Sequence, residues 1–377
     1  MHRQPGEMIN IEVCTPPDHW AAFPQVIRTE REIVLCYAMQ EIKKLRSSGI
    51  HQHFQPFPCM MWSFSTDDGY SWRTTDRAPS VGRILDCSYG QPTADGGMVT
   101  ISCPKPFISK YAFLQKGNVG YIPYSSHLPA EETVHITDLG PSESFYFHSM
   151  TRTSDGGLLA AGYAPVDDED EAGCCAAVFL KSEDEGMSWR YLSQVSSGND
   201  SFGFTETGLL GGEDGHVLCL LRTDFHGSLA LEQKPPEARK GAGYFLYQVE
   251  SWDNGETWSN PVQLPIWGHP PHLTRLQSGA ILLVNGHRRP PYSVRAVLSY
   301  DNGKSWDMKT MRSFRTFDPG HYDIGYPQAT QLDDGTILCT YYGYSTPEVD
   351  TSSPYSLSPC GIFVSLFDEE WLEKGEG

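Results

Sequence analysis

The chain has 377 residues and a formal net charge of −19 at pH 7. Because nucleic acids and anionic membrane surfaces repel an acidic protein, neither is an expected partner. The 36 glycines and 27 prolines, without a sustained helical period, are typical of a protein built from many short strands.

Taken in chain order, the predicted strands begin at residues 9–13 and then recur with a long period. Five apolar strands each follow a tight turn that contains Gly, and residues 33–36 form a sixth, less regular copy. The five are residues 98–101, 158–161, 217–220, 281–284 and 337–340. Successive turns lie about 60 residues apart, which suits a four-stranded blade. The sequence therefore predicts an all-β, six-bladed β-propeller as a single domain over residues 1–377, with residues 9–13 completing the last blade.

A second repeat supports the same fold. Four segments share the pattern Ser-x-Asp-x-Gly-x-Ser/Thr-Trp, namely residues 65–72, 182–189, 251–258 and 299–306. In this pattern Asp can accept bonds from backbone N–H groups, Gly can adopt the positive φ of a turn, and Trp can pack beneath it. We expect each segment to form a hairpin on outer strands, away from the ligand pocket. Residues 365–371 look like a degenerate further copy.

These segments resemble the Asp-boxes of the sialidase superfamily, whose members are BNR-repeat β-propellers, and the resemblance extends over nearly the whole chain. The box is structural, so it indicates the fold and leaves the chemistry open. In such propellers the innermost strands of the blades meet at one pocket. Counting nine residues back from the turn glycines places Glu206 and Tyr326 at this pocket, with His148 beside the equivalent position and His269 and His272 nearby.

Two segments match the family pattern residue by residue. Residues 204–210, followed by Arg222, resemble the segment that carries the catalytic glutamate and a carboxylate-binding arginine. Residues 325–327 resemble the segment with the nucleophilic tyrosine. The resemblance therefore implies Tyr326 as nucleophile and Glu206 as the base that takes its proton.

Further residues are candidates for binding the substrate. Guanidinium groups bind carboxylates through two parallel hydrogen bonds, so Arg222, Arg288 and Arg289 are expected to bind an acidic sugar. Trp267 is expected to stack on the sugar ring, and His148, His269 and His272 are expected to line the pocket. No metal or cofactor is predicted.

The chain departs from the family pattern in the first blade. The family carries Arg before Ile-Pro on the first inner strand, whereas Ala22 stands at this place. The family's general-acid Asp also has no clear counterpart. His51 and His53 lie about where it is expected, so one of them is the predicted acid.

These features leave three functions open. The first is an exo-acting, sialidase-like glycoside hydrolase on the terminal acidic sugar of a glycan, with an acidic oligosaccharide or glycoconjugate as its partner. The second is a lyase that cleaves a uronate by β-elimination, as in the related ulvan and rhamnose-glucuronate lyases; the several histidines and the missing arginine favour it. The third is a carbohydrate-binding propeller without catalytic activity.

The N-terminal residues and the cysteines indicate the compartment. Residues 1–10 are polar and contain no apolar signal sequence, so the predicted location is cytoplasmic, or secreted if a leader has been removed. In a reducing compartment the ten cysteines stay unpaired. Cys36, Cys219 and Cys339 lie in apolar strands and are expected to be buried free thiols. No oligomeric state is predicted.

Overall fold

The computed structural model describes residues 3–44, 59–77, 82–94, 96–101, 114–115, 121–124, 144–165, 175–198, 202–225, 244–317, 324–346 and 358–374. These residues form an all-β structure in which nearly every element is a strand. A short helix, α3 (Glu369–Glu373), follows the last strand. None of the helical segments in these ranges has the length and apolar character needed to cross a membrane.

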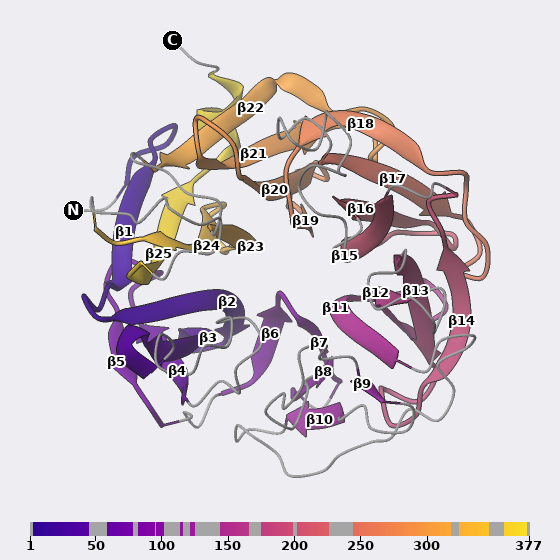
Figure 1. Cartoon of the computed structure of the whole chain (residues 1–377), viewed down its shortest axis with the longest axis horizontal. Helices are drawn as coiled ribbons and strands as arrows, with labels where there is room; N and C mark the ends of the chain where they lie inside the picture. The colour runs from indigo at the N-terminus through magenta and orange to yellow at the C-terminus, as the bar shows by residue number, and fades with distance from the viewer. Residues whose placement is uncertain are drawn as a thin grey trace.

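Successive strands pair antiparallel in groups that follow one another along the chain (Figure 1). The first group is β2 (His19–Thr29), β3 (Ile33–Glu41), β4 (Cys59–Ser65) and β5 (Arg73–Thr75). The second is β7 (Gly90–Pro92), β8 (Met98–Ile101) and β10 (Tyr121–Tyr124), while β6 (Ile84–Cys87) pairs with β2. The third is β11 (Ser144–Arg152), β12 (Leu158–Pro165), β13 (Cys175–Ser182) and β14 (Arg190–Val195), with β9 (Leu114–Gln115) paired to β11.

The remaining strands form three further groups of the same kind. The fourth is β15 (Phe202–Gly211), β16 (Val217–Phe225), β17 (Phe245–Ser251) and β18 (Val262–Trp267). The fifth is β19 (Pro271–Arg275), β20 (Ile281–His287), β21 (Ser293–Ser299) and β22 (Asp307–Thr316). The last is β23 (Gly325–Gln331), β24 (Ile337–Tyr344), β25 (Cys360–Phe367) and the N-terminal β1 (Ile9–Cys14).

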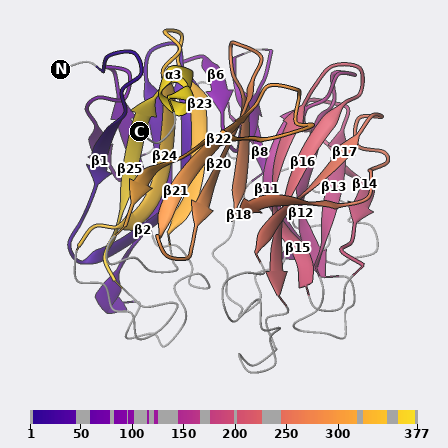
Figure 2. The ribbon, with the colours of Figure 1, turned by 90° about the horizontal axis from the view of Figure 1, so that it is seen from above.

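The groups succeed one another around a common centre, as Figure 1 shows. The first strand of a group, such as β11, β15 or β19, lies nearest the centre, and the last strand, such as β14, β18 or β22, lies at the periphery. Seen from above, the strands run between the same two faces of the molecule (Figure 2). The first strands also contact one another: β11 contacts β15, β15 contacts β19, and β23 contacts both β19 and β2. Equivalent residues of different groups are thereby brought together at the centre.

The N-terminal strand joins the end of the chain. β1 pairs antiparallel with β25 from Ile9 opposite Leu366 to Cys14 opposite Ile362, with a shift of register after Glu12. This confirms the predicted pairing of residues 9–13 with the last group. A parallel contact between Trp20 of β2 and Cys360 of β25 then links the last group to the first.

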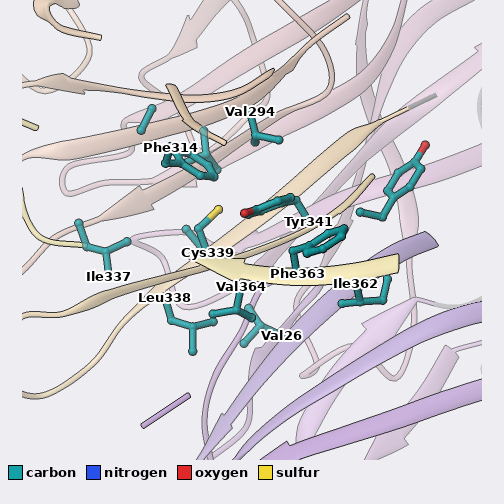
Figure 3. Packing of buried hydrophobic residues seen from close by; sticks show 14 of the residues in the cluster. Val26, Val294, Phe314, Ile337, Leu338, Cys339, Tyr341, Ile362, Phe363 and Val364 are labelled. Carbon is teal, nitrogen blue, oxygen red and sulfur yellow. The ribbon is translucent and has the colours of Figure 1, made fainter. Parts of the chain in front are cut away.

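The main core lies on both faces of the last group. Every residue of β24 and β25 is buried, so these strands read as continuous apolar runs and not as an alternating pattern. Figure 3 shows Cys339 and Tyr341 of β24 pointing towards Phe314 of the fifth group, and Leu338 pointing towards Val26 of the first. The rings of Phe314 and Tyr341 lie 5.5 Å apart between centroids. The last group is thus packed between its two neighbours.

The four predicted boxes lie at the turns between the third and fourth strands of their groups, which confirms their placement on outer hairpins. In the box of residues 251–258, Asp253 accepts bonds from the Thr257 N–H at 2.8 Å and from the Thr257 hydroxyl at 2.6 Å. The Ser251 hydroxyl oxygen accepts from the Gly255 N–H at 2.8 Å. Asn254 and Gly255 both have positive φ, at 59° and 95°, as in a type I′ hairpin turn.

The predicted further box at residues 365–371 is wrong. Asp368 instead caps helix α3, because its side chain accepts the N–H of Trp371 at 2.8 Å. Glu369 and Glu370 follow Asp368, and no glycine is present to take the positive φ that the box turn needs. An Asp followed by good helix formers begins a helix.

The cysteine prediction is confirmed for the described thiols. Cys36, Cys219 and Cys339 are buried thiols outside any disulfide. The same holds for the buried Cys87 and Cys360, while the half-buried Cys14 and Cys175 also form no disulfide.

Candidate active site

Four of the innermost strands are irregular at corresponding positions of the repeat. The pairing register shifts between Ala22 and Gln25 on β2, Phe147 and Ser149 on β11, Phe204 and Thr207 on β15, and Gly325 and Gln328 on β23. A bulge takes a residue out of the regular ladder and redirects its side chain. The residues inside these bulges include Phe23, His148, Glu206 and Tyr326. The bulges therefore determine which side chains point towards the centre.

Glu206, Tyr326 and Arg222 are in mutual contact, as predicted. The Tyr326 hydroxyl donates a hydrogen bond to Oε1 of Glu206, and Nη1 of Arg222 donates to Oε2 of the same carboxylate. Nη1 of Arg222 also lies 3.3 Å from the Tyr326 hydroxyl oxygen. Arg222 lies towards the end of β16, and its long side chain brings its charge back to the bulge of β15. The second nitrogen, Nη2, donates to Asp224 at 2.9 Å.

Tyr326 adopts a conformation that is unfavourable for a bulky residue. Its φ is 48°, and Phe23 has a φ of 58°. Such left-handed conformations cost about 1–3 kcal/mol and persist where the surroundings impose them. The ring of Tyr326 lies edge-on to Phe23, with centroids 4.7 Å apart, and 6.0 Å from the ring of Tyr342. The Arg288 guanidinium lies 5.2 Å from the ring centroid of Tyr326. This packing holds the phenol against Glu206.

The environment keeps Glu206 ionised and Tyr326 neutral. Burial raises the pKa of Glu206, but Arg222, His148, the hydrogen bond from Tyr326 and Arg288 together hold it below its ordinary value. Burial and the negative charge of Glu206 raise the pKa of Tyr326 well above its ordinary value, against the opposing effect of Arg222 and Arg288. In the resting site an ionised Glu206 therefore accepts a hydrogen bond from the hydroxyl group of a neutral Tyr326.

Two of the three predicted arginines meet at Tyr326. Arg288 is buried, donates through Nε to the Ile324 carbonyl at 2.8 Å, and lies 3.4 Å from the Tyr342 hydroxyl. Arg289 instead lies 4.9 Å from the centroid of the Trp267 ring and donates to His287. Through these contacts Arg289 lies beside Trp267 and His287, not at the Glu206–Tyr326 pair.

The structure corrects the expected role of Trp267. Its side chain is only 4 % exposed, and it is packed against Tyr244, His269 and His287 as well as Arg289. A ring covered in this way presents no face on which a sugar can stack. The physical reason is that Trp267 ends β18, where its side chain is enclosed by β20 and the segment that leads into β19.

The predicted histidines have different positions. His148 lies beside the site, with its ring 6.2 Å from that of Tyr326. His269 is fully buried, and burial together with Arg222 and Arg288 lowers its pKa well below the ordinary value. His272 lines a different cavity of about 390 Å³, whose lining does not include Glu206 or Tyr326, and burial lowers its pKa to about 4. His51 and His53, the predicted acids, lie outside the described residues.

Two residues that contact the site, Tyr342 and Asp224, were not recognised from the sequence. Ala22 marks the place of the missing arginine, yet it is fully buried in the ladder opposite Ala38, and the bulge directs Phe23 to Tyr326 instead. Tyr342 of β24 had no distinguishing pattern. Asp224 had one, because it stands two residues after Arg222 on the same face of a strand.

Comparison with known proteins places this geometry in a family. Residues 136–339 match the family model described as a BNR repeat-like domain. No curated protein matches the sequence. Among solved structures, a protein of unknown function from Dyadobacter fermentans is 21% identical with a TM-score of 0.71, over 95% of this chain and 97% of that one.

Two sialidases have a similar fold at lower identity. The Trypanosoma rangeli sialidase in complex with the inhibitor DANA is 14% identical with a TM-score of 0.59, over 96% of this chain and 60% of its own. A mutant of the NanB sialidase from Streptococcus pneumoniae is 13% identical with a TM-score of 0.56, over 92% of this chain and 68% of its own. The chain thus spans about 60% of the length of the Trypanosoma rangeli sialidase. Because the BNR repeat-like model covers more than half of the 377 residues, the chain belongs to this family.

Proposed function

We propose that the protein is an exo-acting glycoside hydrolase of the sialidase type, which removes a terminal acidic sugar from a glycan. The contact of Tyr326 with Glu206 and Arg222 carries this proposal. The proposal also takes the strand groups as the six blades of one propeller, with β1 completing the last blade. It is supported by the central position of the first strands and by the packing of the last group between the fifth and the first.

The proposed reaction uses Tyr326 as the nucleophile. Its oxygen attacks the anomeric carbon while Glu206 takes the phenol proton and the bond to the leaving oxygen breaks. A phenol needs a base in contact with it because its pKa here is raised well above the ordinary value. An acid, predicted to be His51 or His53, protonates the leaving oxygen. Water then attacks the anomeric carbon and gives a proton to the acid that was deprotonated in the first step. The bond to the Tyr326 oxygen breaks, this oxygen takes its proton back from Glu206, and the sugar is released.

An acidic sugar suits the charge distribution of this site. Arg222 and Arg288 bring two positive charges to the ring of Tyr326. A neutral phenol attacks a sugar that carries a carboxylate without the repulsion that an Asp or Glu nucleophile would meet. In the first blade Ala22 stands at the place of the family's arginine and Phe23 contacts Tyr326, so two arginines rather than three would contact the carboxylate.

The test is turnover of 4-methylumbelliferyl glycosides of N-acetylneuraminic acid, 2-keto-3-deoxynononic acid, glucuronic acid and galacturonic acid. With the substrate that the protein cleaves, Tyr326→Phe should lower kcat at least about 10³-fold, because the nucleophilic oxygen is lost. Tyr247→Phe is the matched control, since it removes an outer-strand hydroxyl that bonds Gln263. Unchanged turnover in Tyr326→Phe would exclude the mechanism.

A lyase acting on a uronate is the second candidate. Two observations favour it: Ala22 stands where the family carries a carboxylate-binding arginine, and the His148 imidazole lies next to the Glu206–Tyr326 pair. In β-elimination a base removes the proton at C5 of the uronate, and the leaving oxygen departs from C4. The product is an unsaturated uronate that absorbs in the near ultraviolet. Its appearance with uronate-capped oligosaccharides would establish the lyase, and release of an intact sugar would establish the hydrolase.

A further inference from the structure

His148 is a buried group beside the site that the proposed mechanism does not use. Its side chain is only 3 % exposed, and the bulge between Phe147 and Ser149 directs it away from the β11–β12 ladder. Its ring lies 5.7 Å from that of Tyr89 and 6.2 Å from that of Tyr326. An imidazole in this position is within reach of a ligand bound over Tyr326.

A backbone contact fixes which ring nitrogen carries the proton. Nδ1 of His148 lies 2.7 Å from the carbonyl oxygen of Thr207. A carbonyl oxygen only accepts hydrogen bonds, so Nδ1 must carry the hydrogen. Burial lowers the pKa of His148, with Arg222 acting in the same direction and Glu206 and the Thr207 carbonyl opposing it, so the ring is neutral at pH 7. Nε2 therefore presents an unshared electron pair.

The contact also fixes this electron pair relative to the reacting groups. Thr207 directly follows Glu206 on β15. Its hydroxyl lies 2.7 Å from the hydroxyl of Ser149, the residue after His148. Two adjacent residues of β11 are thus tied to the residue next to the catalytic carboxylate. The position of Nε2 is therefore set by the same strand that positions Glu206.

Nε2 is a buried acceptor whose partner is not a protein group that the structure describes. Within the described ranges it makes no hydrogen bond, although it is shielded from solvent. Buried acceptors without a donor are rare in native proteins and often have a role in binding or catalysis. A sugar is rich in hydroxyl donors, which match this acceptor.

We propose that Nε2 of His148 accepts a hydrogen bond from a hydroxyl group of the sugar whose anomeric carbon lies over Tyr326. This rests on the proposed function and extends it to specificity. The substrate is a sugar with a free hydroxyl on the side that faces β11, and a deoxy or substituted sugar at that position is a poor substrate. His148 selects the sugar, whereas Glu206 and Tyr326 perform the reaction.

Two variants separate the roles of the ring nitrogens. His148→Asn keeps a donor for the Thr207 carbonyl near the place of Nδ1 but removes the acceptor at Nε2. His148→Gln places an amide oxygen near the position of Nε2. We expect kcat/KM to fall about 10- to 100-fold in His148→Asn and less in His148→Gln, because a lost hydrogen bond leaves a buried hydroxyl unsatisfied. With a substrate that lacks that hydroxyl group, wild type and His148→Asn should have the same kcat/KM.

A direct measurement on the folded Tyr326→Phe protein avoids turnover. The ¹⁵N resonance of Nε2 is followed while N-acetylneuraminic, 2-keto-3-deoxynononic, glucuronic and galacturonic acid are added in turn. We expect an unprotonated Nε2 in the free protein and an upfield shift with at least one sugar. A protonated Nε2 in the free protein, or no shift with any of the four, overturns the inference.

The two proposals fail in different ways. If Tyr326→Phe abolishes turnover while His148→Asn leaves kcat/KM unchanged, the inference is wrong and the hydrolase proposal stands. If a sugar shifts the Nε2 resonance but Tyr326→Phe leaves turnover of its glycoside intact, the hydrolase proposal is wrong and the hydroxyl contact stands.

Discussion

Arg222 binds two carboxylates at once, and this arrangement links the stability of the protein to its site. Its two terminal nitrogens contact Glu206 and Asp224, and the side chains of Arg222 and Glu206 are each only 9 % exposed. A buried carboxylate stays ionised only when cations and hydrogen-bond donors compensate for the lost solvent. At Glu206 this compensation comes from the guanidinium groups of Arg222 and Arg288 and from the hydroxyl group of Tyr326. The groups proposed for the reaction therefore also stabilise one another.

We predict that Arg222→Met destabilises the protein at neutral pH by about 3–5 kcal/mol, because it leaves Glu206 buried without its main counter-ion. Urea unfolding at pH 7 measures the loss. The matched double variant Arg222→Met with Glu206→Gln should recover part of the stability, since it removes the uncompensated charge. Equal stabilities of the single and double variants would contradict this account.

The pH dependence of the same variants follows from the direction of the pKa shift. In the wild type the pKa of Glu206 is lowered, so its contribution to stability is present above the pKa of the unfolded chain and is lost as the pH falls through the folded value. In Arg222→Met, burial raises the pKa of Glu206 instead. The destabilisation should then be largest above this raised pKa and should shrink as acid protonates Glu206. Unfolding curves between pH 4 and pH 8 test whether the destabilisation shrinks as the pH falls.

The sequence predicted Glu206 and Tyr326 correctly because both follow the period of the repeat. The same count of nine residues ends at Phe147 in the third group, and the next residue, His148, was the predicted candidate. The bulge does direct His148 to the site, while Phe147 is buried in a core cluster. The same one-residue offset separates Ala22 from Phe23. Bulges depend on how two strands pair, and no local residue pattern marked them here. The repeat count therefore indicates the neighbourhood of each inner residue, and the bulge decides which of two neighbouring residues faces the site.

At the scale of elements, the boxes were predictable because the hydrogen bonds that shape each turn are local. Each box joins residues within the turn, and the Asp carboxylate accepts bonds from a residue four positions later. The inner strands differ, since their bulges and side-chain directions depend on partners about 60 residues away, as in the contact between Ser149 and Thr207. Residues 365–371 keep the Asp but lack the Gly, and they form a helix cap instead of a box. The box turn therefore needs the Gly as well as the Asp.

We predict that Asp253→Ala lowers the stability by about 1–3 kcal/mol, because the Ser251 hydroxyl and the Thr257 N–H lose their acceptor. Glycosidase activity should stay unchanged, since the box lies on an outer hairpin. Glu256→Ala in the same turn is the control, because Glu256 is exposed and forms only a surface ion pair with Arg190. Thermal unfolding and turnover are measured together, and a loss of activity in the folded variant would show that the box acts on the site.

At the scale of the whole molecule, the chain ends are held together by side chains as well as by strand pairing. Nη1 of Arg3 lies 2.5 Å from the Asp368 carboxylate, and Nη2 donates to the Thr336 hydroxyl at 3.0 Å. Asn10 of β1 accepts from the Ser365 hydroxyl of β25 and donates to the Phe314 carbonyl of the fifth group. The N-terminal segment thus contacts two different groups. Loss of the N-terminal segment should therefore destabilise more of the molecule than the single strand with which β1 pairs.

We predict that deletion of residues 1–14 lowers the melting temperature of the whole protein and promotes self-association. Without β1, the backbone groups of β25 from Ile362 to Leu366 lose their partners, and an unpaired apolar strand edge pairs readily with another chain. Deletion of residues 1–7 is the control, since it removes the Arg3 contacts but keeps β1. Size-exclusion chromatography with light scattering and a thermal melt compare both deletions with the full chain. If the longer deletion behaves like the shorter one, pairing of β1 with β25 is not what joins the ends, and the proposed closure of the six blades through β1 is wrong.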